Sequence, residues 1–260
     1  MSASAKSVDL KIHRFPAYIS RLPPCTQVLI LVTVLASLVD FLSIADVQSF
    51  GALIPDKISV FSAHRANTYP FVHDGIISAL LNLGASVPFI QRFEVQHGTL
   101  ASFALFFGPL STFPAFLYVL LDRFVFHSND ALMGASVWTF LLIGLETAGN
   151  RKIQPHLGLG SYRVPTWALL LLVIVCTEAL IPSTSLKGHM CGAGVGYMCG
   201  LGLLKWVCPP EKVLRWIESK LSLQRRLSHY ASVDQKAYGR FGVLPTNNSG
   251  PDGGIEIGSV

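Results

Sequence analysis

The stretch from Leu186 to Leu203 reads LKGHMCGAGVGYMCGLGL and carries a glycine at every fourth position. Residues four apart share one face of a helix, so these glycines form a single smooth stripe. Glycine weakens a helix in water, but inside a bilayer a stripe of small residues lets a neighbouring backbone approach closely. The stretch therefore predicts a membrane helix that packs tightly through Gly188, Gly192, Gly196 and Gly200.

A histidine, His189, lies at the start of this stripe. An ionisable side chain in an apolar helix is a functional-site hypothesis by default. Another apolar segment carries Gly134-Ala135-Ser136, and a serine becomes a nucleophile when a histidine base lies beside it. We therefore expect the stripe to bring His189 to Ser136.

The composition is that of an all-α, polytopic membrane protein. Hydrophobic residues are 51% of the 260 residues, charged residues only 13%, and the mean hydropathy is +0.49. A transmembrane barrel would show alternation of apolar and polar residues, which is absent. Six helical spans are expected, each near the roughly 20 residues that cross a bilayer. They lie at about 26–45, 70–90, 100–121, 131–148, 165–182 and 186–208.

The distribution of positive charge predicts the topology. Of the 20 Lys and Arg residues, 16 fall in the two termini and the even-numbered loops, and 4 fall in the odd-numbered loops. Positive residues stay on the cytosolic side, so both termini are expected in the cytosol. The net charge of +5 then needs no nucleic-acid partner. The five cysteines lack paired C-x-x-C spacing, so neither a zinc site nor a disulfide framework is expected. No other metal site and no cofactor are expected either.

The chain accordingly divides into four parts. A cytosolic segment, 1–25, precedes the six-span membrane domain, 26–208. A basic amphipathic segment follows at 209–236, and it would either lie on the cytosolic leaflet or form a solvated basic helix. The tail, 237–260, is rich in Gly, Asn, Pro and Ser and is expected to be disordered.

The topology places the candidate serine and histidine at similar depth. Ser136 lies about five residues, or roughly 7.5 Å, inside the fourth span, and His189 lies roughly 4.5 Å inside the sixth. Both spans run inward from the lumenal side. A Ser–His dyad is sufficient for acyl transfer, although a serine in a small-residue helix can also simply bond its own backbone.

The second span adds polar groups on the same side. Ser78 and Asn82 are four apart and share a helical face. The Asn82 amide would either donate to a developing oxyanion or make an interhelical hydrogen bond. His73, nine residues before Asn82, would project from the opposite face of a continuous helix.

These residues carry a resemblance to the rhomboid family of intramembrane serine proteases, in the small six-span fungal form, over about residues 20–208. The motifs are Thr68-Tyr69-Pro70, Asn82-Leu83, Arg92-Phe93-Glu94, His97-Gly98-Thr99, Gly134-x-Ser136 and His189-x-x-Gly192-x-x-x-Gly196. The resemblance implies a Ser136 nucleophile and a His189 base that cleave transmembrane substrates near their lumenal end. It also implies a Golgi membrane location.

Two positions depart from the family pattern. Rhomboids usually read G-x-S-G, but Val137 follows the serine here. They usually carry a histidine four residues before the span-two asparagine, where this chain has Ser78. The resemblance therefore implies an oxyanion hole reduced to Asn82 and backbone N–H groups, supported by Ser78.

One other function is compatible with the sequence. A derlin-like, catalytically weak or inactive rhomboid fold would bind transmembrane helices for membrane-protein quality control. The tail segment Arg240-Phe241-Gly242-Val243-Leu244 is similar to short motifs that recruit AAA segregases in this superfamily. A transporter would need an inverted repeat, which the sequence lacks.

Overall fold

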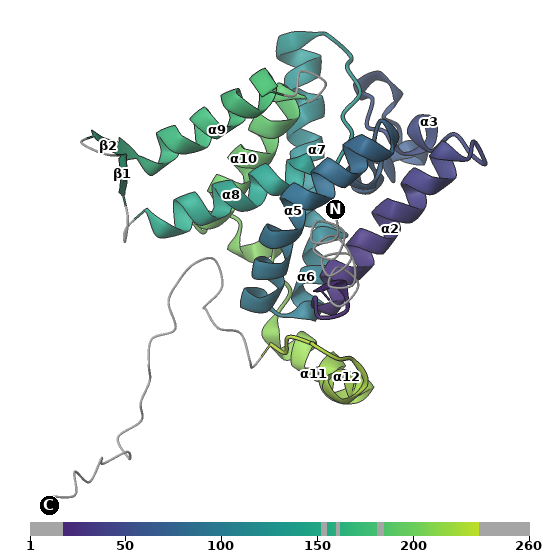
Figure 1. Ribbon diagram of the computed structural model, residues 1–260, viewed down its shortest axis with the longest axis vertical. Coiled ribbons are helices and arrows are strands. Elements are labelled where there is room, and N and C mark those ends of the chain that lie inside the picture. The colour runs from purple at the N-terminus through teal and green to yellow at the C-terminus, as the bar shows by residue number, and fades with distance from the viewer. Residues whose placement is uncertain (1–17, 152–154, 160–161, 181–184, 234–260) are drawn as a thin grey trace, which may run out of the picture.

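The computed structural model describes residues 18–151, 155–159, 162–180 and 185–233. This part of the chain is a helical bundle with one small β-hairpin, which confirms the predicted all-α membrane fold (Figure 1). Every expected span corresponds to a helix or a pair of helices. They are α2 (Pro24–Phe41), α5 (Gly75–His97), α6 (Thr99–Phe106) with α7 (Pro109–Leu121), α8 (Ser136–Asn150), α9 (Thr166–Leu180) and α10 (Leu186–Gly200).

The helices differ in length. Within the described residues, α2, α5 and the stretch Thr99–Phe126 are each long and apolar enough to cross a membrane by length and composition. Helices α8, α9 and α10 have 15 residues each. The chain is thus an integral membrane protein whose later helices are short, and α10 forms a fourth candidate span only together with the bent stretch that follows it.

Shorter elements connect these helices. The loop after α2 contains α3 (Val47–Gly51), η1 (Pro55–Lys57), η2 (Val60–Ser62), α4 (Arg65–Thr68) and η3 (Tyr69–Phe71). A π-helical turn, η4 (Asp122–Phe126), extends α7. Strands β1 (His156–Leu159) and β2 (Tyr162–Pro165) pair antiparallel, with His156 opposite Pro165. After α10 come η5 (Lys205–Val207), α11 (Glu211–Leu221) and α12 (Leu223–Arg226).

The second span is longer than expected at its C-terminal end. We expected a loop at 91–98, but α5 continues to His97 and ends at Gly98, whose φ is +93°. The fully buried Glu94 carboxylate explains the difference. It accepts hydrogen bonds from the N–H groups of Cys25 at 2.8 Å and Thr26 at 2.7 Å. A charged residue therefore stays inside a helix because it caps the start of α2.

The fourth span begins later than expected. We placed its start near Ala131, but α8 starts at Ser136. Leu132 instead pairs with Leu53 as an extended bridge, with backbone hydrogen bonds of 2.8 and 3.1 Å. Gly134 then adopts a φ of +100°, which a residue with a side chain rarely does. This irregular backbone delays the helix by five residues and makes Ser136 its first residue.

The buried side of α8 is organised around Trp138, which is 1% exposed. Its ring makes edge contacts with Phe71 and Phe106, at centroid distances of 5.2 and 5.3 Å. Its Nε1–H donates to Ser111 Oγ at 3.0 Å. Since buried indole N–H groups need a partner, this bond fixes the rotation of α8 about its axis.

The glycine stripe packs α10 against α8, and these two helices form the most extensive interface in the bundle (Figure 1). The facing pairs are Gly192 with Val137, Gly196 with Leu141, and Gly200 with Leu145. A methyl group added at any of these glycines would collide with the backbone carbonyl oxygen of its partner, at 2.5 Å for Gly192 and Gly200. The even spacing shows that the helices run parallel, with three of the four stripe glycines against α8, while Gly188 faces the Leu132 side chain.

Gly196→Ala should destabilise the protein, because the new methyl group would displace the Leu141 carbonyl from a close-packed interface. Overpacking of this kind costs about 1–3 kcal/mol. Gly194→Ala is the matched control, since a methyl group there would meet nothing within 4 Å. Thermal unfolding of both variants in detergent checks the prediction, and equal midpoints would contradict it.

Candidate functional site

Ser136 is partly exposed and lies at the N-terminus of α8, after a backbone turn that two hydrogen bonds hold in place. The Gly134 N–H donates to the Tyr69 carbonyl at 3.0 Å. The Ala135 N–H donates to His73 Nε2 at 3.2 Å. The first N–H groups of a helix have no intrahelical acceptor, so α8 begins with backbone donors beside the serine hydroxyl.

His73 lies against this turn, and our expectation that it projects away is wrong. That expectation assumed a continuous helix from His73 to Asn82, whereas α5 starts only at Gly75. The buried imidazole accepts from Ala135 through Nε2, so Nδ1 carries the proton and donates to the Phe71 carbonyl at 3.2 Å. Burial lowers the pKa of His73, which agrees with a neutral ring.

Asn82 also adjoins the turn. Its Nδ2 would be 3.8 Å from a methyl group on Gly134. The same nitrogen donates to the Ser78 carbonyl at 2.9 Å and lies 3.5 Å from Ser78 Oγ. The structure therefore places both predicted support residues on one face of α5, and brings Asn82 next to the segment that carries Ser136.

His189 is fully buried near the start of α10. Its ring stacks on Phe140, with centroids 4.2 Å apart and an interplanar angle of 35°. Phe140 lies one turn after Ser136 on α8, so the two share a face. The register of the glycine contacts puts His189 two residues, or about 3 Å, from the level of Ser136. The predicted match in depth therefore agrees with the packing.

The imidazole nitrogens of His189 make no hydrogen bond among the described residues, so the expected Ser136–His189 hydrogen bond is not formed in this structure. The nearest carboxylate belongs to Glu178 on α9, whose Oε2 lies 3.9 Å from Nδ1. Sequence reasoning left Glu178 without a role and did not consider Phe140. The spacing of four from Ser136 could have identified Phe140, but nothing in the sequence pairs Glu178 with His189.

The departure at Val137 has a structural explanation. Its side chain is fully buried, and it packs in a cluster with Leu132 and Cys191. The close approach of Gly192 is to the Val137 carbonyl, which any residue would present. The valine therefore fills the α8–α10 interface and leaves Ser136 partly exposed.

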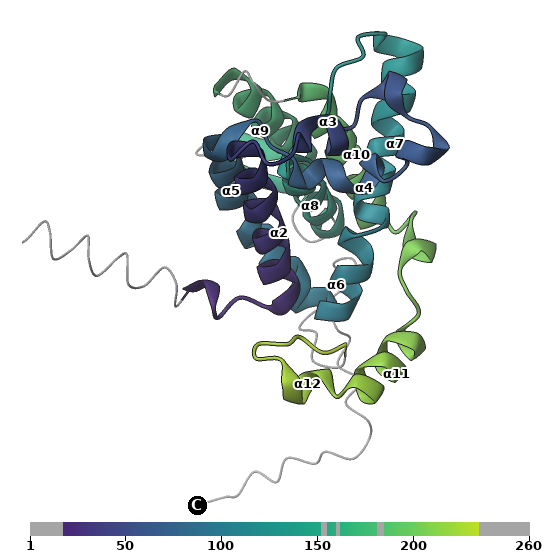
Figure 2. The same ribbon diagram turned by 90° about the vertical axis from the view of Figure 1, so that its right-hand side faces the viewer.

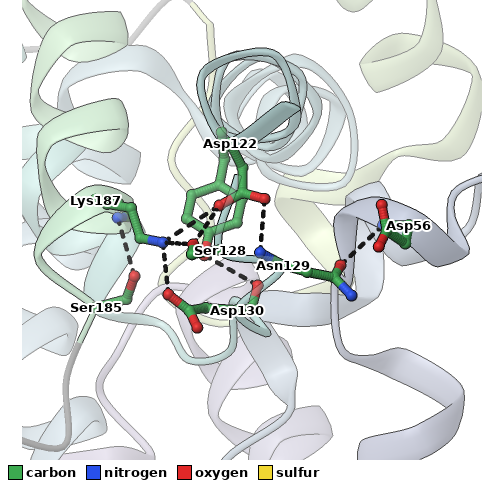
Figure 3. Close-up of polar contacts among 9 residues, drawn as sticks. Asp56, Asp122, Ser128, Asn129, Asp130, Ser185 and Lys187 are labelled. Carbon is green, nitrogen blue, oxygen red and sulfur yellow. Dashed lines mark hydrogen bonds and ion pairs between the residues drawn. The ribbon is translucent and has the colours of Figure 1, made fainter. Parts of the chain in front are cut away.

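An ion-pair cluster lies beside the start of α10 (Figure 3). Lys187 Nζ lies 2.6 Å from Asp130 Oδ2 and 3.3 Å from Asp122 Oδ1, and it also contacts Ser128 Oγ. Asp122 is buried and accepts further bonds from Ser128 Oγ at 2.6 Å and from the Asn129 N–H at 2.9 Å. The hydrogen bond from Lys187 lowers the pKa of Asp130, which keeps that carboxylate charged.

This cluster connects the two halves of the site. Asp130 belongs to the loop that leads to Ser136, and Lys187 lies two residues before His189. Asn129 Oδ1 also accepts from the Asp56 N–H at 3.0 Å, which ties the same loop to η1. The ion pairs thus hold the segment that precedes the serine against the helix that carries the histidine.

Comparison with known proteins agrees with this arrangement. The rhomboid domain family matches residues 60–206, a range that contains the Ser136 turn, Asn82 and the glycine stripe. The chain belongs to the rhomboid family. The family assignment confirms the resemblance seen in the sequence motifs, and with it the helical membrane bundle.

Several fungal rhomboids are similar over nearly their whole length. Rhomboid-type serine protease 2 of Neurospora crassa is 46% identical, covering 100% of this chain and 95% of the relative. Rhomboid-type serine protease 2 of Gibberella zeae is 46% identical, covering 92% and 90%. Rhomboid-type serine protease B of Aspergillus fumigatus is 48% identical, covering 90% and 86%.

Lys187→Met should destabilise the ion-pair cluster, since the Asp122 side chain is 4% exposed and would lose its cation. Loss of a hydrogen-bonded partner by a buried charge costs about 1–3 kcal/mol. Arg123→Met, at an exposed position of the same turn, should change stability little. Chemical unfolding of both variants measures the difference. An Asp130→Asn substitution should lower the free energy of unfolding less in the Lys187→Met protein than in the wild type. Equal decreases would exclude an energetic coupling between Lys187 and Asp130.

Proposed function

We propose that this rhomboid is an intramembrane serine endopeptidase that cleaves transmembrane proteins near the lumenal end of their spans. Ser136 is the nucleophile and His189 is the general base. The observation that carries the proposal is the glycine-locked register of α8 and α10, which sets His189 against Phe140, one turn from Ser136. The protease names of the fungal relatives support it, and favour it over a derlin-like, non-catalytic role.

The reaction proceeds by acyl transfer. Ser136 Oγ attacks the scissile carbonyl while His189 accepts the hydroxyl proton, and a tetrahedral oxyanion forms. His189 then donates that proton to the leaving amine, and the C–N bond breaks. A water molecule hydrolyses the resulting acyl-enzyme by the same route, with His189 again accepting and returning the proton.

The oxyanion is stabilised by the start of α8 and by Asn82. Backbone N–H groups of the first turn supply fixed donors near the reacting carbonyl, and the positive end of the helix dipole lies there. The Asn82 amide, which bonds the Ser78 carbonyl in this structure, adds a side-chain donor by turning toward the oxyanion. His73 contributes indirectly, because its bond to Ala135 fixes the turn before Ser136.

The dyad closes when substrate binds. The His189 ring is already oriented by stacking on Phe140, with the Glu178 carboxylate facing Nδ1. Catalytic hydrogen bonds are often long in free enzymes and shorten only in the complex with substrate. Approach of the Ser136 hydroxyl and the imidazole is therefore the expected first step.

The location of the protein is part of the same proposal. Both termini face the cytosol, as the Lys and Arg distribution indicates, and the compartment is the Golgi membrane, as the rhomboid resemblance implies. The segregase-binding motif that we considered at 240–244 lies outside the described residues, as does the tail at 237–260.

Ser136→Ala should abolish labelling by a fluorophosphonate probe, because the probe reacts only with an activated serine hydroxyl. His189→Asn should slow labelling strongly, since the general base is lost. Ser219→Ala, on α11, is the control and should be labelled like the wild type. In-gel fluorescence of purified protein reports all four rates. Equal labelling of wild type and Ser136→Ala would refute the dyad.

Asn82→Ala should lower kcat for cleavage of a reconstituted transmembrane substrate, with little change in KM. Loss of one oxyanion donor typically costs about 10²–10³ in kcat. Ser78→Ala is the matched control on the same face and should have a smaller effect, because the Asn82 amide bonds mainly the Ser78 backbone. A wild-type kcat for Asn82→Ala would remove Asn82 from the oxyanion hole.

A further inference from the structure

Helix α11 is turned across the end of the bundle. The axes of α10 and of the stretch Lys205–Leu221 differ by 92°. Figures 1 and 2 both show α11 and α12 at the end of the bundle where α6 begins. With α10 taken as crossing the bilayer, this bend directs α11 roughly along the membrane surface.

One face of α11 is bound to the bundle. Leu214 packs with Ala101 of α6 and with Val233, and all three are buried. The buried Glu218 carboxylate accepts hydrogen bonds from Tyr230 Oη at 2.8 Å, Ser232 Oγ at 3.0 Å and the Val233 N–H at 3.1 Å. These contacts fix the rotation of α11, so its other faces have defined directions.

The two remaining flanks differ in chemistry. Val213, Trp216 and Ile217 are spaced by three and four residues and form an exposed strip, which we call the outer flank, and the exposed Lys220 lies on the same strip, one turn after Trp216. Val213 is 49% exposed and Trp216 is 62% exposed. Arg215 and Ser219 lie on the side of α11 away from Val213 and Ile217, and Lys212 lies one turn before Trp216. A bound face together with exposed apolar side chains that have basic residues beside them is typical of a helix that lies in a membrane interface.

We propose that the outer flank of α11 lies in the headgroup region of the adjoining leaflet and binds lipid. Further exposed apolar side chains lie between α10 and α11, where Leu203 is 62% exposed and Trp206 is 75% exposed. Tryptophan favours this depth because its ring is apolar and its N–H is polar. Lysine and arginine side chains near the tryptophan attract anionic lipid headgroups, which the cytosolic leaflet carries.

Lipid binding at α11 would reach the transmembrane helices. The segment after α12 pairs with the α5–α6 turn: the Thr99 N–H donates to the Ala231 carbonyl at 2.8 Å, and the Ala231 N–H donates to Thr99 Oγ1 at 3.0 Å. Helices α11 and α12 are thereby connected to the ends of α5, α6 and α10. This inference does not depend on the Ser136–His189 dyad, and the Ser136→Ala protein serves equally well to test it.

The experiment places an environment-sensitive fluorophore on α11 of the full chain. Cys176 and Cys208, the accessible cysteines, are first changed to Ser, while Cys25, Cys191 and Cys199 are buried. Single cysteines are then introduced by Val213→Cys, Trp216→Cys or Ser219→Cys and labelled with nitrobenzoxadiazole. The proteins are reconstituted in phosphatidylcholine vesicles, with and without phosphatidylserine, and quenched with doxyl lipids or with aqueous iodide.

Labels at positions 213 and 216 should emit at shorter wavelength than the label at 219, and doxyl lipids should quench them several-fold more. Phosphatidylserine should increase this difference. Equal quenching by iodide at all three positions would overturn the proposal, because the helix would then be solvated. Protection of 213 and 216 from both quenchers would also overturn it, since a second copy of the chain would then cover the outer flank.

Discussion

The approach of the α10 backbone to the carbonyl oxygens of α8 is the constraint on which the rest of the structure depends. Glycines at 192, 196 and 200 add no side chain of their own to the interface, so two 15-residue helices hold one register. That register sets the level of His189 relative to Ser136. Without a hydrophobic driving force between helices in lipid, close van der Waals packing of this kind supplies much of the association.

The sequence predicted this interface well because glycine spacing is a local signal. Glycines spaced by four indicate a close-packing helix face, whichever helix lies against it. Hydropathy located each span to within several residues. The irregular turn before Ser136 was not predictable in the same way. Its shape depends on Leu53, Tyr69 and His73, which come from segments more than 60 residues away. The position of His73 was misjudged for that reason.

Buried carboxylates were the second kind of feature that the sequence concealed. Glu94, Asp122 and Glu218 are acidic residues, a type usually found in loops or at the surface, yet all three are buried. Each accepts several hydrogen bonds from partners that become neighbours only after folding, which compensates for its desolvation. A hydropathy profile predicts the end of a membrane span at such residues. In this protein they hold helix ends together instead.

The glycine contacts also have an evolutionary consequence. Gly192, Gly196 and Gly200 each meet a main-chain carbonyl of α8, and every amino acid supplies one. The two helices are therefore constrained unequally. Apolar side chains along α8 can be exchanged during evolution, whereas the stripe glycines of α10 cannot be replaced, because every other residue has a Cβ atom. Val137, which replaces a glycine usual in the family, is an instance of the permissive side. Divergence in this family should accumulate on α8 and spare the stripe.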